Sequence, residues 1–186
     1  MMWRRVVAGL AKHRVLATNS FVFGSLSGLA ELSQQGLLRR LGSEDQKKKP
    51  INWSAVGRYV FVGGLVFSPV LTVWYRWLDG RMPGTGARVV AKKVAVDALV
   101  LDVPLYTVFY MTMNGLEGKS FSQGFEEVKS KLAPTVVFSI LLWVPAQAFN
   151  FMFLPPKMRV VYIAIVTFLE MNVLALMKRI PLRDDE

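Results

Sequence analysis

Four carboxylates interrupt the long apolar runs of this chain, and they are the side chains best placed to do chemistry. Glu31, Asp97, Asp102 and Glu170 each stand in a stretch made mostly of hydrophobic residues. An Asp at the middle of a bilayer costs about 2.5 to 3.5 kcal/mol on insertion scales, so these groups should face protein or water. They predict the polar interior of a membrane bundle.

Amides accompany these acids at helical spacing. Gln35 follows Glu31 by one turn, and Gln147 and Asn150 share a stripe of a later helix. Such amides either hydrogen-bond between helices or present selectivity groups in a pore, and the sequence leaves both alternatives open. The residues predicted to line a pore or polar interior are Glu31, Gln35, Asp102, Gln147, Asn150 and Glu170.

The two aspartates of the third apolar run are expected to have different partners. Asp97 lies four residues after Lys93, so the two are expected to form a structural or gating pair. Asp102 has no basic residue at helical spacing, which makes it the better candidate for contact with water or a cation. Helix kinks are predicted at Pro69, Pro104 and Pro145, because proline removes a backbone hydrogen bond.

The elements that must position these residues are membrane-spanning helices. Hydrophobic residues make up 53% of the chain and charged residues only 19%, against about 25% in soluble domains. About 20 apolar residues suffice for a helix to cross the bilayer. The predicted fold is an all-α, multi-pass transmembrane bundle with spans at about 15–38, 55–78, 90–114 and 133–153.

Two further helices complete the predicted bundle. A short amphipathic helix is expected over 120–131, lying along the membrane surface, because its apolar residues recur at spacings of three and four. The apolar run 160–177 predicts a fifth crossing, with a buried or interfacial helix as the alternative. One integral domain is expected over 15–179, followed by a polar tail over 180–186.

The N-terminal segment 1–14 is basic and contains no acid. Arg4, Arg5, Lys12 and Arg14 are typical either of a mitochondrial targeting segment or of the flank of the first span, and the two interpretations have equal support. The chain has no cysteine, and His13 is its single histidine. We therefore expect no metal site and no cofactor.

The net charge of +10 points to anionic partners. Basic residues gather in short segments beside the apolar runs, where anionic lipid headgroups such as those of cardiolipin are their natural partners. Three consecutive lysines, Lys47 to Lys49, lack the aromatic platform that nucleic-acid binding uses, so no nucleic acid is expected. Loop charges are balanced between the two sides and do not orient the protein.

Six residues in the later part of the chain have the spacing of a known signature, W-P-x-x-Q-x-x-N-F-x-x-V-P-x-x-x-R. The residues at matching offsets are Trp143, Gln147, Asn150, Phe151, Pro155 and Arg159. This pattern resembles the signature of the Mpv/PMP family of mitochondrial inner-membrane and peroxisomal membrane proteins.

Earlier segments also resemble this family. The matching positions are Glu31, Gln35, Pro69, Trp74, Tyr75, Leu78, Asp79, Pro83, Gly84, Lys92, Lys93 and Asp97. The chain departs from the pattern at Ser68 (Gly in the family), Ala98 (Gln) and Glu170 (Trp), and the signature proline stands one place later at Pro145. The resemblance is thus to a divergent member.

The resemblance implies an organellar membrane protein that forms, or contributes to, a channel for small metabolites or ions. It implies the mitochondrial inner membrane, with the peroxisomal membrane as the alternative. A second hypothesis is a structural or assembly subunit of a larger mitochondrial membrane complex, with no conductance of its own. A homo-oligomer is compatible with either. No catalytic residues and no enzymatic activity are predicted, because no nucleophile and base accompany the acids.

Overall fold

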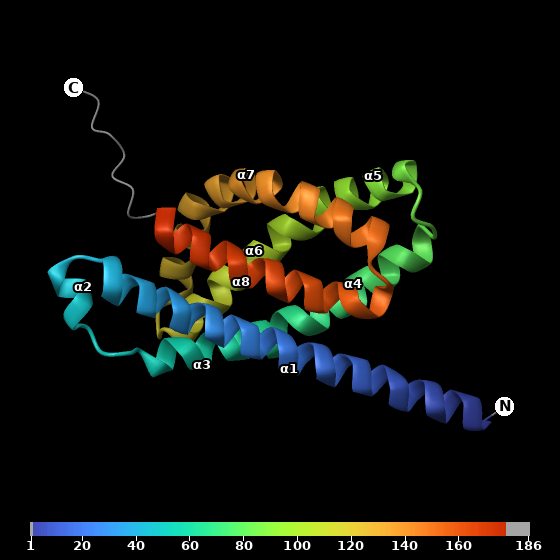
Figure 1. Cartoon of the computed structure of the whole chain (residues 1–186), viewed down its shortest axis with the longest axis horizontal. Helices are drawn as coiled ribbons and strands as arrows, with labels where there is room; N and C mark the ends of the chain where they lie inside the picture. The colour runs from blue at the N-terminus through green and yellow to red at the C-terminus, as the bar shows by residue number, and fades with distance from the viewer. Residues whose placement is uncertain (1, 178–186) are drawn as a thin grey trace. The chain divides into compact units, whose positions relative to one another are not determined.

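Helices make up the whole of the regular structure (Figure 1). The computed structural model describes residues 2–177, with side chains described for 14–172 except at 46 and 134. The helices are α1 (Met2–Leu41), α2 (Glu44–Lys48), α3 (Trp53–Phe61), η1 (Val62–Phe67), α4 (Ser68–Arg81), α5 (Ala87–Val96), η2 (Asp97–Leu101), α6 (Asp102–Leu116), α7 (Phe121–Phe153), η3 (Pro156–Met158) and α8 (Arg159–Met177). No strand occurs within residues 2–177. The all-α prediction is confirmed.

Within the part of the chain that the structure describes, four helical segments are long and apolar enough to cross a membrane. They are Arg14–Leu41, Trp53–Arg81, Ala87–Leu116 and Thr135–Phe153, which match the four predicted spans. The predicted fifth span falls in α8, whose side chains are described only to Asn172, so this crossing stays a prediction. The predicted polar tail, 180–186, lies outside the described residues.

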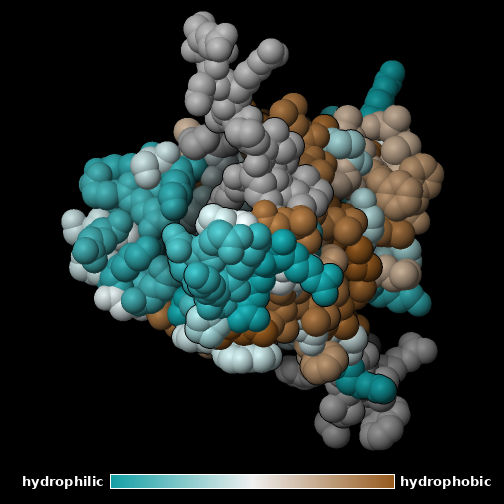
Figure 2. All heavy atoms as spheres, turned by 60° about the vertical axis from the view of Figure 1, so that its left-hand side comes forward, coloured by the Kyte–Doolittle hydropathy of each residue, from teal (hydrophilic) through white to brown (hydrophobic). Residues whose placement is uncertain are grey.

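Large hydrophobic side chains lie on the outside of these spans. Phe21, Leu99 and Leu141 are each about three-quarters exposed, at 75%, 76% and 75%. Figure 2 shows hydrophobic and hydrophilic residues gathered into separate patches on one face of the molecule. Such apolar outer surface is what contact with lipid requires, and it supports the membrane assignment.

The contacts divide the chain into two compact units. The first unit is Met1–Ser68 with Val161–Glu186, and the second is Pro69–Val160. The helical run from α3 to α4 passes from one unit to the other after Ser68, and α8 does so after Val160. The single integral domain expected over 15–179 stays a prediction. So do the two interpretations of 1–14, because side chains are described only from Arg14.

Within the first unit, α1 packs against α3 and η1 through glycines (Figure 1). A Cβ placed on Gly64 would lie 2.9 Å from the Ser20 carbonyl oxygen and 3.4 Å from the Gly24 Cα. The two backbones therefore approach more closely than any larger residue allows. Gly24 therefore lies at a point of close backbone packing.

Gly64→Ala is expected to lower the free energy of unfolding by about 1 to 3 kcal/mol, because the backbone of α1 must move to admit the methyl group. Gly57→Ala is the matched control, since a Cβ on Gly57 meets nothing within 4 Å and alanine favours a helix. Thermal unfolding in detergent measures both. Equal melting temperatures for the two variants would contradict the close approach.

Two of the three predicted proline kinks coincide with π-helical turns. η1 ends just before Ser68 and Pro69, and the Ser68 N–H donates to the Gly63 carbonyl five residues back. η2 ends at Leu101, three residues before Pro104. A wider turn accommodates the proline ring, which would otherwise clash with the carbonyl four residues earlier. Pro145 lies within the unbroken α7, where no π turn is present.

The amphipathic segment 120–131 and the fourth span are one helix, α7, rather than the two expected. Ser120 and Gln123 form a capping box that begins the helix. No glycine separates the amphipathic part from the apolar part, and the helix continues through Pro134 at their junction. Hydrogen bonds from Lys131 and then Lys119 lower the pKa of Glu127, in the polar first turns, to about 2.

Candidate functional site

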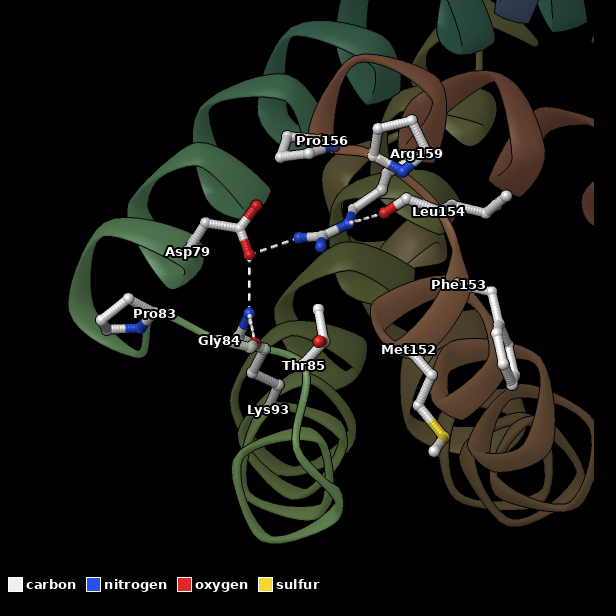
Figure 3. Close-up of a pocket in the computed structure, with 11 residues that line it drawn as sticks. Asp79, Pro83, Gly84, Thr85, Lys93, Met152, Phe153, Leu154, Pro156 and Arg159 are labelled. Atoms are coloured by element: carbon white, nitrogen blue, oxygen red, sulfur yellow. Dashed lines mark hydrogen bonds and ion pairs between the residues drawn. The ribbon is translucent and has the colours of Figure 1, made fainter.

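An ionic cluster lies at the end of the second unit where α4 ends and α8 begins (Figure 3). Lys93 Nζ donates to Asp79 Oδ1 at 2.8 Å and to the Gly84 carbonyl at 3.2 Å. Arg159 forms an ion pair with the same Asp79 oxygen, and its Nε donates to the Leu154 carbonyl at 3.4 Å. Both cations are buried, with 1% and 2% of their surface exposed. The Asp79 carboxylate therefore pairs with both buried cations.

The Phe151 ring lies against both cations of this cluster. Lys93 Nζ lies 5.6 Å and Arg159 Cζ 5.1 Å from the ring centroid. Tyr75 packs edge-to-face on the same ring, with centroids 5.7 Å apart. Phe151 is fully buried, and its electron-rich face adds cation–π stabilisation to both bases.

A hydrogen-bonded network surrounds the Asp97 carboxylate and includes the Tyr75 hydroxyl. The Trp74 indole N–H donates to Asp97 Oδ1 at 2.7 Å. Gln147 Nε2 donates to Asp97 Oδ2 and, at 2.6 Å, to the Tyr75 hydroxyl. Asn150 Nδ2 donates to Gln147 Oε1 at 2.8 Å. Side chains from α4 and α7 thus hold the buried Asp97 carboxylate of η2 through neutral donors.

A second buried acid lies further along the same unit. The Ser139 hydroxyl, on α7, donates to Asp102 Oδ2 at 3.2 Å, and both residues are buried. No Lys or Arg among the described side chains lies within ion-pair distance of Asp102 or Asp97. Both acids are therefore held by uncharged partners inside membrane-spanning helices.

The structure gives Lys93 and Asp97 separate partners instead of the expected pair. Lys93 reaches across to Asp79, whereas Asp97 turns to Trp74 and Gln147. The spacing of four places both on one helix face, but α5 gives way to the π turn at Asp97, and the partners supplied by α4 and α7 are closer. Lys93 and Asp97 therefore belong to two distinct clusters.

In the first unit, Glu31 and Gln35 form a local link. Gln35 Nε2 donates to Glu31 Oε1 at 2.8 Å, and its amide also bonds the backbone of Asn52 at 2.8 and 3.2 Å. Asn52 in turn caps α3 by accepting from the Ala55 N–H. Gln35 therefore fixes the start of α3. Glu170 lies half-buried on α8.

The predicted pore residues are thus distributed over both units. Glu31, Gln35 and Glu170 belong to the first, and Asp102, Gln147 and Asn150 to the second. That they line one path stays a prediction.

Four residues join the site without having been predicted for it. Trp74, Tyr75, Asp79 and Arg159 were matched only as family signature positions, and the structure makes them direct partners of the buried acids and bases. Of the other signature residues, Trp143 lies half-buried on α7 and Pro155 is exposed in the loop after it. Ser139 could have been found from its place on the stripe that also carries Gln147. Among the described residues no group of His, Cys, Asp and Glu could hold a metal ion.

Comparison with known proteins places this site in a family. The family model described as Mpv17 / PMP22 family matches residues 114–175. The chain is 30% identical to PXMP2/4 family protein 2 of Dictyostelium discoideum, over 86% of this chain and 82% of the relative. It is 29% identical to Protein SYM1 of Saccharomyces cerevisiae, over 83% of this chain and 79% of the relative.

A third relative carries its location in its name. The mitochondrial inner membrane protein Mpv17 of Caenorhabditis briggsae is 24% identical, over 92% of this chain and 91% of its own. No solved structure matches. The relatives named for the mitochondrial inner membrane support that location for this chain. With the buried signature residues, the match over most of both chains establishes that this protein belongs to the Mpv17/PMP22 family.

Proposed function

We propose that this protein forms, or contributes to, a conductance for small metabolites or ions across the mitochondrial inner membrane. The observation that carries the proposal is Asp97, a carboxylate 3% exposed within a membrane-spanning helix and held only by the neutral donors of Trp74 and Gln147. An acid in this position is expensive to maintain, and such residues typically mark ion or substrate paths.

The network around Asp97 supplies the gate in this proposal. Its donors come from α4 and α7, so separating either helix from η2 exposes the carboxylate to water. Asp97 also begins a π-helical turn, a local irregularity common at functional positions. In this proposal the described conformation, in which Trp74 and Gln147 both contact Asp97, corresponds to the closed state.

Current through reconstituted protein tests the proposal. Purified protein in planar bilayers is expected to give discrete voltage-driven currents, and Asp97→Asn or Asp102→Asn is expected to shift the reversal potential in a salt gradient toward greater anion permeability. Glu126→Gln is the control, because this exposed acid pairs only with Lys129 outside the spans. Absence of current from the wild-type protein at all voltages would remove the proposal.

A specific observation favours a second function, that of an assembly or structural subunit. The buried acids and amides of the second unit are hydrogen-bonded to one another, as expected if they only hold helices together. In that case the protein should purify from mitochondria in fixed stoichiometry with other chains. In either function, anionic lipids are expected to contact the basic loops of the protein.

A further inference from the structure

A pocket of about 470 Å³ opens beside the ionic cluster (Figure 3). Its walls are the loop between α4 and α5, including Gly84 and Thr85, the last residues of α7, and the Leu154–Pro156 segment. Asp79, Lys93 and Arg159 lie in the same wall. The volume falls within the range of about 300 to 1,000 Å³ typical of small-molecule sites.

The charge of this wall is incompletely balanced. Two buried cations face one carboxylate, which leaves an excess of one positive charge. Arg159 Nη1 makes the ion-pair contact with Asp79 but no hydrogen bond, and Asp79 Oδ2 is buried without a hydrogen-bond partner. Buried polar atoms in native proteins are nearly always satisfied, so the Asp79 Oδ2 acceptor is available to a ligand that donates a hydrogen bond.

The approach to the pocket is also basic. Exposed bases stand at Arg81, Arg88, Lys92 and Lys157, within or beside the segments that line it. Neither 80–96 nor 152–160 contains an acid. A concave site rimmed by one sign of charge concentrates ligands of the opposite sign. The pocket therefore favours an anion.

We propose that this pocket binds a phosphate group that carries or adjoins a hydroxyl. Lys93 and Arg159 donate to the phosphate oxygens, in the geometry for which guanidinium is suited. Asp79 Oδ2 accepts from the hydroxyl, a P–OH or a neighbouring C–OH. An ionised carboxylate ligand has no donor for this oxygen, which is why phosphate is the better match. A soluble phosphate and a hydroxyl-bearing phospholipid headgroup share this chemistry.

Ligand-dependent stability tests the site, because a ligand that binds the folded state raises the melting temperature by mass action. The wild-type protein in neutral detergent is titrated with inorganic phosphate against chloride at matched ionic strength. A second arm compares nanodiscs of phosphatidylcholine with and without cardiolipin. Stabilisation in the first arm identifies a soluble ligand, and stabilisation in the second arm alone identifies a lipid headgroup.

Two variants locate the effect. Lys93→Gln removes a positive charge, and Thr85→Phe fills the pocket from its exposed loop while leaving all three charges and the packed helices in place. Each is expected to weaken binding by about tenfold or more, the loss expected for a hydrogen bond to a charged group. Lys92→Gln is the charge-matched control, since Lys92 is exposed and does not line the pocket.

Two results would overturn the proposal: no stabilisation of the wild-type protein in either arm, or full stabilisation of Thr85→Phe. The second result counts even if Lys93→Gln fails to fold. Binding is measured without any current, so failure here is distinct from failure of the proposed conductance.

Discussion

Asp79→Asn is expected to lower the free energy of unfolding by about 3 to 5 kcal/mol, the loss found when a buried ion pair is broken on one side. Asp79 is the carboxylate partner of both Lys93 and Arg159, whose side chains are 1% and 3% exposed. Asparagine keeps the shape but leaves two buried cations facing each other. Unfolding by denaturant in detergent micelles, followed by tryptophan fluorescence, measures the loss.

Glu126→Gln is the matched control for this prediction. It breaks an ion pair of the same unit in which both side chains are more than half exposed, so it should change stability by less than about 1 kcal/mol. Adding Lys93→Met to Asp79→Asn should recover part of the loss, because one buried charge is then removed. If Asp79→Asn and Glu126→Gln lowered the free energy of unfolding equally, the ionic cluster would contribute no more stability than a surface ion pair.

The spans are the part of the fold that the sequence predicts well. The interior of a bilayer excludes charged side chains and backbone groups without hydrogen bonds. The uncharged apolar runs Tyr59–Tyr75 and Val136–Phe153 are therefore expected to form helices, in which every backbone group can be bonded. Their boundaries in the structure differ by a few residues from the predicted ones, because helices extend past the hydrocarbon into polar residues such as Arg81. Hydropathy predicts the crossing but not where the helix ends.

The partners of the charged residues are the part that the sequence does not predict. Lys93 and Asp97 suit each other by local spacing, and the structure instead pairs Lys93 with Asp79, fourteen positions away in sequence. Local spacing compares residues on one helix, whereas Asp79 comes from another helix and Arg159 from a third. Such partners depend on how helices pack, and no periodicity in a single sequence reports that.

The same limit applies to the network around Gln147. The stripe on α7 indicates that Gln147 faces a polar interior, but Trp74 and Tyr75 look like interfacial aromatics from their position at the end of a span. In the structure Trp74 bonds Asp97, and Tyr75 accepts from Gln147 and is 3% exposed. Family resemblance marks these positions; only the packing of α4 and α7 gives them partners.

Gln147→Leu is expected to destabilise the protein by at least about 3 kcal/mol, because it removes partners from three buried groups at once. Asp97 Oδ2 and the Tyr75 hydroxyl lose a donor, and the Asn150 amide loses its acceptor. Each buried group left without a partner costs about 1 to 3 kcal/mol. Leucine is similar in size to glutamine, so the loss reflects hydrogen bonding rather than a cavity. Denaturant unfolding in detergent provides the measurement.

A double-mutant cycle with Tyr75→Phe tests whether part of the loss in Gln147→Leu comes from the hydrogen bond between Gln147 and Tyr75. Tyr75→Phe removes only the hydroxyl that Gln147 Nε2 contacts at 2.6 Å and retains the edge-to-face packing on Phe151. In the wild-type background it should cost about 1 kcal/mol, and in the Gln147→Leu background it should cost nearly nothing or stabilise, because the orphaned hydroxyl is then gone. Strict additivity of the two substitutions would mean that Gln147 and Tyr75 are not bonded.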